Sequence, residues 1–299
     1  MLLQDQENLI SITTNIADIT EGEIIRMATK SPEKTSKSVK EPKYSKKNQS
    51  AKSQTEKLLN TENPSAIPFS VVEAYKNIRV QLTTILDKTG GNVVAISSPN
   101  ASEGKSTTAI NIAITLSQLN KKVIIVDVDI RRGTVHQKLK MDNDIGCLDV
   151  LSGKTELEQV IKSYNPSLDV ITCGQNKNNS LELFDSDGFD AMLQKLKTDY
   201  DYVILDTPPI NLVSDALVIA KKCDGLLFVI RSSVTTYEAF RKALNSIERL
   251  NVNMLGVVLN AVDAHSGKYY KYGKYGKYGY YNSNKYYGYN SYDYSRMPK

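Results

Sequence analysis

The chain has 299 residues, of which 40% are hydrophobic and 24% charged, with a net charge of +5 at pH 7. This length allows one large domain or two small ones, with a sizeable core. Segments 30–57 and 266–299 carry +6 each and segment 1–29 carries −4, which leaves −3 for residues 58–265. The folded part therefore does not favour a basic groove for nucleic acid, whereas the flanks could meet acidic partners or an anionic membrane surface.

The cysteines fit a reducing compartment, and the apolar runs do not indicate a membrane span. Cys147, Cys173 and Cys223 have no close spacing, which suggests neither a metal site nor a disulfide framework. No run reaches the roughly 18 apolar residues of a membrane span, and the N-terminus lacks the features of a signal peptide. We expect a cytoplasmic chain, for which contact with a membrane would need a partner.

The N-terminal segments carry little folding information. Residues 1–29 have scattered apolar positions that favour at most a short helix. Residues 30–66 are rich in Lys and Ser and cannot bury enough apolar surface to fold alone. We predict a largely disordered extension and linker over 1–66, one domain over 67–264 and a flexible tail over 265–299.

The first strong element is an amphipathic helix over Phe69–Leu86. Its apolar positions recur at helical spacing and are Val72, Tyr75, Ile78, Leu82 and Ile85. Glu73, Lys76 and Arg79 lie three apart, so they line an adjacent strip of the helix. A solvated helix face is the ordinary interpretation of such a strip.

Residues 93–108, VVAISSPNASEGKSTT, have the pattern of a phosphate-binding loop between a strand and a helix. Such a loop wraps phosphates in backbone N–H groups, and the helix N-terminus adds a favourable dipole. Lys105 would reach the β- and γ-phosphates, and the Ser106 hydroxyl would ligate Mg²⁺. Pro99 stands five residues before Gly104, where the full motif has its first glycine.

Strand-like and helix-like segments alternate from residue 92 onward. The apolar runs are Val93–Ser97, Lys121–Asp127, Leu168–Thr172, Tyr202–Asp206, Gly225–Ile230 and Met254–Asn260, and helical patterns cover Asp187–Thr198, Ser214–Lys222 and Thr235–Leu250. This alternation predicts an α/β fold with a mostly parallel sheet flanked by helices. Functional residues should then gather at the carboxyl ends of the strands.

Three aspartates end two of these runs. Asp127 and Asp129 lie in IIVDVDIRR, and Asp206 lies in VILDTPP. Mg²⁺ prefers oxygen ligands and usually takes one or two carboxylates together with substrate phosphates. A single such aspartate is as easily a strand-end cap, but three of them beside a phosphate loop favour a metal and nucleotide site.

The last segment is a low-complexity tail in which the unit Lys-Tyr-Gly repeats. It holds twelve of the eighteen tyrosines of the chain: Tyr269, Tyr270, Tyr272, Tyr275, Tyr278, Tyr280, Tyr281, Tyr286, Tyr287, Tyr289, Tyr292 and Tyr294. An adhesive or solubilising segment is the alternative interpretation. Tyrosines among lysines and glycines can also stack on single-stranded nucleic acid, but the acidic central part gives that little support.

These motifs together resemble the bacterial protein-tyrosine kinases (BY-kinases) that control capsule and exopolysaccharide synthesis. The similarity covers about residues 70–299 and rests on SEGKSTTAINIA, IIVDVDIRR, YDYVILDTPP, DIGCLDVLSG, NSLELF and the tyrosine-rich tail. The strip Glu73-x-x-Lys76-x-x-Arg79 is similar to the E-x-x-R-x-x-R oligomerisation motif of the family, with Lys in place of the first Arg. The family fold is a P-loop ATPase domain with a deviant Walker A motif, related to partition and septum-site ATPases.

The resemblance implies ATP and Mg²⁺ as cofactors and assigns roles by matching position. The residues that would hold the phosphates are Ala101, Ser102, Glu103, Gly104, Lys105, Ser106 and Thr107. Asp127 would take the proton of the attacking tyrosine hydroxyl, while Asp129 and Asp206 would hold Mg²⁺. Asn260 matches the residue that hydrogen-bonds the adenine.

The resemblance also implies partners and a regulatory role. It predicts a ring of identical subunits, a separate membrane-anchored activator of the Gram-positive type, and autophosphorylation of the tyrosine cluster. A tyrosine phosphatase and polysaccharide enzymes would be further partners or substrates. Arg131 and Arg132 fit either stabilisation of phosphoryl charge or a solvated basic pair.

Two positions depart from the family pattern without affecting the chemistry directly. Ala101-Ser102 stands where the family frequently has Pro-Gly, so a positive φ at Ser102 would cost about 1 kcal/mol. Gly133 replaces a frequent proline after the arginine pair, which changes the stiffness of the loop.

Other P-loop proteins remain as alternatives. Partition-type ATPases, which transfer phosphate to water, usually carry a signature lysine at the position of Asn100 and lack a tyrosine tail. A regulator that binds ATP without kinase activity is the second alternative. Iron–sulfur carrier ATPases would need a C-x-x-C motif that the sequence does not contain.

Overall fold

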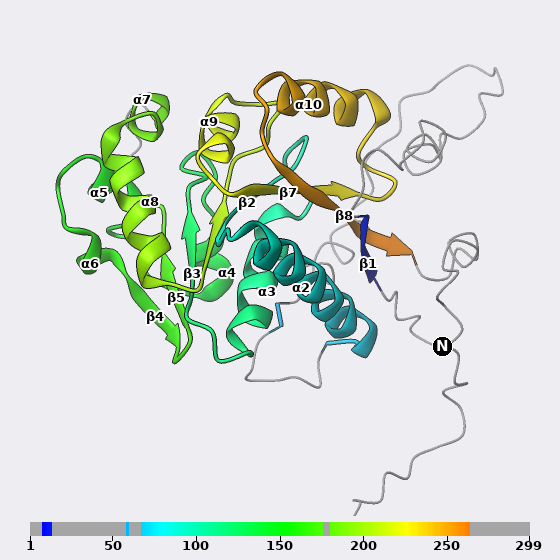
Figure 1. Cartoon of the computed structure of the whole chain (residues 1–299), viewed down its shortest axis with the longest axis horizontal. Helices are drawn as coiled ribbons and strands as arrows, with labels where there is room; N and C mark the ends of the chain where they lie inside the picture. Colours follow the sequence, from blue (N-terminus) through cyan, green and yellow to red (C-terminus); the bar gives the residue numbers. More distant parts are fainter. Residues whose placement is uncertain (1–7, 14–57, 60–66, 176–179, 264–299) are drawn as a thin grey trace, which may run out of the picture. The chain divides into compact units, whose positions relative to one another are not determined.

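The computed structural model describes residues 8–13, 58–59, 67–175 and 180–263. Helices cover both faces of one central sheet (Figure 1). In this described part of the chain, none of the helices combines the length and the apolar character needed to cross a bilayer. The predicted tyrosine-rich tail and most of the predicted N-terminal extension lie outside the described residues.

The sheet has eight strands in the order β1-β8-β7-β2-β6-β3-β5-β4. Their bounds are β1 Asn8–Thr13, β2 Val93–Ser97, β3 Val123–Asp127, β4 Lys162–Asn165, β5 Leu168–Ile171, β6 Tyr202–Asp206, β7 Gly225–Arg231 and β8 Met254–Asp263. The two edge strands β1 and β4 are antiparallel to their neighbours, and the other pairings are parallel. The predicted α/β class with a mostly parallel sheet is therefore confirmed.

Nine helices occur in the described part of the chain. They are α2 Phe69–Thr89, α3 Lys105–Ser117, α4 Val135–Leu139, α5 Cys147–Leu151, α6 Leu157–Val160, α7 Ser180–Phe184, α8 Asp187–Asp199, α9 Asp215–Lys221 and α10 Tyr237–Arg249. Side chains of Ser186 and Thr236 accept hydrogen bonds from backbone N–H groups in the first turns of α8 and α10. Such caps satisfy donors that have no partner within the helix and so fix where each helix begins.

The alternation of strand side chains divides the core between the two faces of the sheet. In β2, Val94 and Ile96 pack in one cluster with α2 and α3. Val93 and Ala95 belong to clusters on the opposite face, with α8, α9 and α10. Successive residues of a strand point to opposite faces, so an apolar run buried on both sides is what a covered parallel sheet requires.

For residues 1–29 the sequence favoured at most a short helix. The structure corrects this at Asn8–Thr13, where the chain forms strand β1. This strand pairs with β8, and its register joins Asn8 to Asp263 and Thr13 to Val257. Without β1, strand β8 would be the edge of the sheet and would leave a row of unpaired backbone groups, which β1 satisfies. That long-range partner, rather than local propensity, determines the strand. The domain boundaries around 67 and 264 stay predictions.

Helix α2 buries the face that the sequence predicted. Tyr75, Ile78 and Leu82 are buried, and Val72 and Ile85 pack partly buried at the margin of the same cluster. The charged strip beside this face has two different environments, because only one of its members is tied to a second helix.

Arg79 joins α2 to α3, whereas its two neighbours on the strip pair with each other. The Arg79 guanidinium donates a 2.8 Å hydrogen bond to the backbone carbonyl of Thr115. Lys76 and Glu73 form a 2.7 Å ion pair, with side chains 42% and 39% exposed. Cations near a helix C-terminus interact favourably with its free carbonyls, so Arg79 stabilises the packing of α2 on α3.

Replacing these residues should separate the two environments. Arg79→Ala is expected to lower the free energy of unfolding by about 1 kcal/mol, through loss of a charged hydrogen bond and of side-chain packing. Lys76→Ala should change it by less than about 0.5 kcal/mol, because exposed pairs contribute little. Urea unfolding in dilute solution measures both. Equal effects of the two substitutions would contradict this role of Arg79.

Candidate functional site

The loop between β2 and α3 is held in shape by bonds to Glu103. The Asn100 backbone N–H donates to Glu103 Oε2 at 2.8 Å, and the Thr235 hydroxyl donates to Glu103 Oε1 at 2.7 Å. Glu103 is buried, and its burial raises the pKa of its carboxyl despite these hydrogen bonds. Glu103 therefore orders the loop through its side chain, and only its backbone is suited to face a phosphate.

Gly104 marks the point where the loop becomes a helix. Its φ is +101°, and a Cβ built there would lie 1.9 Å from Nδ2 of Asn260. The Asn260 amide in turn donates to the Glu103 carbonyl at 3.0 Å. Only glycine fits this conformation and this close approach. Ser102 also has a positive φ, +65°, so the strain of about 1 kcal/mol expected at this serine is present.

Helix α3 begins at Lys105, and the N–H groups of its first turn have no partner within the helix. They and the helix dipole favour an anion at this point. The predicted phosphate-binding residues lie along this loop and first turn: Ala101, Ser102, Glu103, Gly104, Lys105, Ser106 and Thr107. Their contact with a nucleotide stays a prediction.

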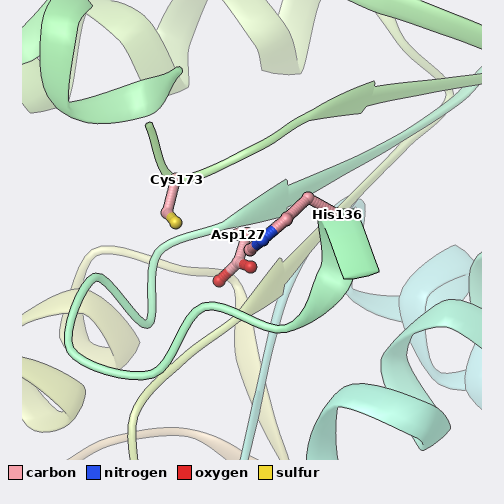
Figure 2. A group of neighbouring side chains, drawn as sticks. All are labelled: Asp127, His136 and Cys173. Atoms are coloured by element: carbon pink, nitrogen blue, oxygen red, sulfur yellow. The ribbon is translucent and has the colours of Figure 1, made fainter. Parts of the chain in front are cut away.

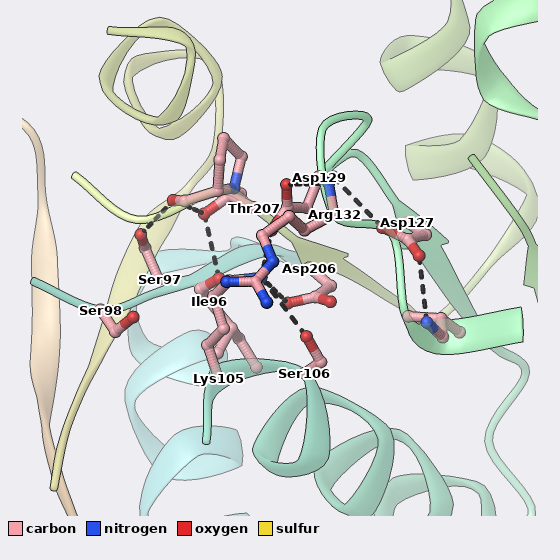
Figure 3. Close-up of polar contacts among 12 residues, drawn as sticks. Ile96, Ser97, Ser98, Lys105, Ser106, Asp127, Asp129, Arg132, Asp206 and Thr207 are labelled. Atoms are coloured by element: carbon pink, nitrogen blue, oxygen red, sulfur yellow. Dashed lines mark hydrogen bonds and ion pairs between the residues drawn. The ribbon is translucent and has the colours of Figure 1, made fainter. Parts of the chain in front are cut away.

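The three predicted aspartates meet beside this loop because of the register of the sheet. β6 lies between β2 and β3, and Asp206 is aligned with both Ile96 and Asp127. Asp129 follows two residues after the end of β3. Its backbone N–H donates to Asp127 Oδ1 at 3.2 Å. The structure thus gathers carboxylates from two neighbouring strands at one edge (Figure 3).

Lys105 is the cation at the centre of this cluster. Its Nζ lies 2.6 Å from Asp129 Oδ2 and 3.4 Å from Asp206 Oδ1. The exposed fractions are 7% for Lys105, 3% for Asp129 and 0% for Asp206. One lysine therefore faces several carboxylates in a region nearly closed to water.

Burial and mutual repulsion set the proton affinities of this cluster. Burial alone would lower the pKa of Lys105, but the charges of Asp206 and Asp129 outweigh it and raise that pKa. Burial raises the pKa of Asp127 well above its usual range, and the nearby Asp206 raises it further. Burial also raises the pKa of Asp206, against the opposing effect of Lys105. A second cation would relieve this excess of buried negative charge.

The donor set fits Mg²⁺. Asp206 accepts a hydrogen bond from the Ser106 hydroxyl. Its Oδ2 is buried and has no hydrogen-bond partner among the residues that the structure describes. Oxygen ligands of this kind, from a hydroxyl and carboxylates, are those that a hard divalent cation selects. Ser106, Asp129 and Asp206 could therefore hold the ion.

The comparisons with known proteins agree with this geometry. A family model described as an AAA domain matches residues 91–255. The tyrosine-protein kinase YwqD of Bacillus subtilis is 35% identical over 189 residues, which cover 63% of this chain and 80% of that protein. The chain belongs to the bacterial tyrosine-protein kinase (BY-kinase) family.

More distant BY-kinases extend the similarity. The tyrosine-protein kinase etk of Escherichia coli K12 is 32% identical over 216 residues, covering 72% of this chain and 29% of that protein. This chain thus spans less than a third of etk. The solved kinase domain of E. coli ETK has a TM-score of 0.66 and 32% identity, and the match covers 70% of this chain and 81% of that domain.

Other predicted positions of this BY-kinase chain differ in what surrounds them. Asn260, in β8, lies near the loop. Its amide nitrogen donates to the Glu103 carbonyl, and its oxygen accepts from the Ala261 N–H at 2.8 Å. An adenine contact would have to use the second N–H of its amide or the second lone pair of its oxygen. Arg131 Nη2 lies 3.5 Å from Asp215 Oδ2, whereas the exposed Arg132 donates its backbone N–H to Asp129 Oδ1 at 3.1 Å.

Sequence reasoning missed the residues that support the site from distant segments. Thr235 reaches Glu103 from across 132 positions of the chain. His136 and Cys173 lie beside Asp127 (Figure 2). A single sequence carries no signal for such contacts, because they depend on which segments the sheet brings together.

Removing the central cation should destabilise the domain in a pH-dependent way. Lys105→Met leaves the buried carboxylates without their counter-charge, which we expect to cost about 3 kcal/mol or more at neutral pH. The folded-state pKa of Asp206 is already raised, so its ionisation lowers stability as the pH rises through that pKa. Without Lys105 the pKa of Asp206 rises further, and the destabilisation should be smaller at pH 5 than at pH 8.

Denaturant unfolding at the two pH values, without nucleotide and with a chelator present, measures this effect. Lys121→Met is the matched control, since Lys121 and Asp201 form an exposed pair with nitrogen and oxygen 3.3 Å apart and should contribute less than about 1 kcal/mol. Lys105→Met behaving like the control at both pH values would contradict the assigned electrostatics.

Proposed function

We propose that this chain is an ATP- and Mg²⁺-dependent protein-tyrosine kinase that phosphorylates the tyrosines of its own C-terminal segment. Through this modification it regulates the synthesis and export of capsular polysaccharide or exopolysaccharide. The observation that carries the proposal is the cluster of Asp127, Asp129 and Asp206 around Lys105 at the mouth of the loop, in a chain whose relatives YwqD and etk are named tyrosine-protein kinases.

Binding of the nucleotide would exchange the partners of Lys105. Its Nζ is pre-positioned at the N-terminus of α3 by Asp129 and Asp206. Phosphate oxygens arriving at the loop compete for this ammonium group, while Ser106, Asp129 and Asp206 become free to hold the metal. Mg²⁺, when bound, neutralises charge on the phosphoryl group that is transferred.

Asp127 is suited to accept the proton of a tyrosine hydroxyl. A tyrosine has a pKa near 10, so it needs a positioned base at neutral pH. The pKa of Asp127 is raised by burial and by Asp206, which brings its proton affinity closer to that of the phenol. As the tyrosine oxygen bonds to the γ-phosphorus, the bond from that phosphorus to ADP breaks and the phenolic proton passes to Asp127.

The acceptors are proposed to be the twelve tyrosines of residues 269–294. The segment 266–299 carries a net charge of +6, and each phosphate adds about −1.5 to −2. Three or four phosphates would therefore cancel its charge. Such a change would alter the affinity of the tail for acidic partners or for an anionic membrane surface.

Assembly and partners extend the proposal. Glu73 and Lys76 remain half-exposed on α2, where they can contact another subunit. In a ring of subunits the tail of one subunit would enter the site of its neighbour, and phosphate would be transferred between subunits. We propose a separate membrane-anchored activator of the Gram-positive type, which would hold the chain at the inner face of the plasma membrane. A tyrosine phosphatase and polysaccharide enzymes are further proposed partners.

The test is phosphosite mapping by mass spectrometry after incubation with ATP and Mg²⁺, together with the activator. The full chain should gain phosphate on tyrosines within 269–294. Asp127→Ala should lose about 10²-fold or more of the rate, the range attributed to a positioned base, and Lys105→Met should lose a similar factor through lost electrostatic stabilisation of the phosphoryl group, about 10²-fold or more. Lys121→Met, which alters an exposed pair, should retain the activity.

The alternative functions give different outcomes. Hydrolysis of ATP without phosphotyrosine would contradict the proposal in favour of a partition-type ATPase. ATP binding without either reaction would favour a regulator. Asn100 disfavours the ATPase, because its amide lies 3.3 Å from Glu103 within the same loop and supplies no cation to a phosphate.

A further inference from the structure

A group of three different metal-binding side chains lies beside Asp127. Asp127 ends β3, His136 belongs to α4 and Cys173 follows β5 (Figure 2). One donor atom from each lies within 4.8 Å of the other two. β3 and β5 are parallel neighbours whose register aligns Val126 with Ile171, so Asp127 and Cys173 leave the sheet at the same edge.

The contacts of these side chains leave coordinating atoms available. Nδ1 of His136 is buried and has no hydrogen-bond partner among the residues that the structure describes. The Cys173 thiol contacts Asn143 Oδ1 at 3.6 Å and the Gly174 carbonyl at 3.4 Å, and metal binding would release the thiol proton and replace these contacts. Asp127 accepts one backbone N–H on each oxygen, from Asp129 and from Val135.

Gly133 permits the sulfur and the carboxylate to approach each other. A Cβ at this position would lie 2.3 Å from Cys173 Sγ and 3.0 Å from Asp127 Oδ2. Any larger residue would therefore displace one or both groups. The glycine, which departs from the proline frequent in the family, keeps this corner open.

We propose that Asp127, His136 and Cys173 form a binding site for a borderline-soft divalent cation, with Zn²⁺ as the best fit. Sulfur, imidazole nitrogen and carboxylate oxygen are the ligands that Zn²⁺ takes, whereas Mg²⁺ takes oxygen. Bond lengths of about 2.0–2.3 Å place tetrahedral ligands about 3.5 Å apart. Side-chain shifts of about 1 Å would close the present spacing, and water would complete the tetrahedron.

This site shares Asp127 with the proposed kinase reaction, and the following consequence rests on that proposed function. A cation held by Asp127, His136 and Cys173 occupies the carboxylate that accepts the tyrosine proton. Zn²⁺ is therefore expected to suppress phosphoryl transfer even when Mg²⁺ and ATP are saturating. The Mg²⁺ ligands Ser106, Asp129 and Asp206 are not part of the zinc site.

Cobalt(II) provides a direct readout of the ligand set. The full chain, reduced and stripped of metal, is titrated with Co²⁺ in the absence of Mg²⁺ and nucleotide. The expected result is one equivalent of Co²⁺ with a thiolate-to-cobalt charge-transfer band and tetrahedral visible bands. Cys173→Ala should lose the charge-transfer band, and His136→Gln, a half-buried position, should weaken binding at least 10-fold.

Cys223→Ala is the matched control, since Cys223 is a free cysteine outside the group, and it should bind like the parent chain. Zn²⁺ should raise the melting temperature of the parent and of Cys223→Ala more than that of the two site variants, because the stabilisation grows with the affinity of the folded state for the metal. Melting curves without metal establish that each variant folds. Absence of the thiolate band in the parent, or an unchanged band in Cys173→Ala, would overturn the proposal.

A kinase assay separates failure of this site from failure of the proposed function. Zn²⁺ should lower autophosphorylation of the parent, and His136→Gln should be less sensitive when each is compared with its own metal-free rate. Cobalt binding by a chain without kinase activity would support the metal site and contradict the proposed kinase function. Kinase activity in a chain that binds no cobalt would support the kinase function and contradict the metal site.

Discussion

The site depends on one lysine that is buried among carboxylates. Lys105 contacts Asp129 and Asp206, and the charge of Asp127 also acts on it. Burying such a cluster costs desolvation free energy, and its ionised carboxylates outnumber the single cation. Because of this excess of negative charge, the carboxylates can bind a metal ion while Lys105 binds an anion. Without a second cation, the same excess weakens the folded domain.

The sheet fixes this arrangement more rigidly than the loop could alone. Asp206 lies on the strand between β2 and β3, and the register places it level with Asp127. The loop adds precision through Glu103, which is held by Asn100 and Thr235. Catalytic geometry that must be kept within fractions of an ångström is best carried by such rigid elements with hydrogen-bonded support. The proposed zinc site uses the same edge, since β5 continues it.

Much of this could be predicted because it is local. Apolar runs ending in aspartate, and the spacing around Lys105, encode the strand ends and the loop. Contacts between distant segments could not be predicted. Asn8–Thr13 pairs with β8 in a segment where the sequence favoured at most a short helix. The contact between Cys173 and His136 was hidden by their separation in sequence. Periodicity specifies an element and its buried face, but it does not specify the element's partner.

The central claim is that Lys105 and its carboxylates form a site for a metal-bound nucleotide. A crystal structure of the chain with Mg²⁺ and a non-hydrolysable ATP analogue tests this most directly. We predict the phosphates at the N-terminus of α3, Lys105 Nζ moved from Asp129 to a phosphate oxygen, and Mg²⁺ held by Ser106 together with Asp206 or Asp129. A nucleotide bound elsewhere, with the 2.6 Å pair between Lys105 and Asp129 intact, would contradict the account.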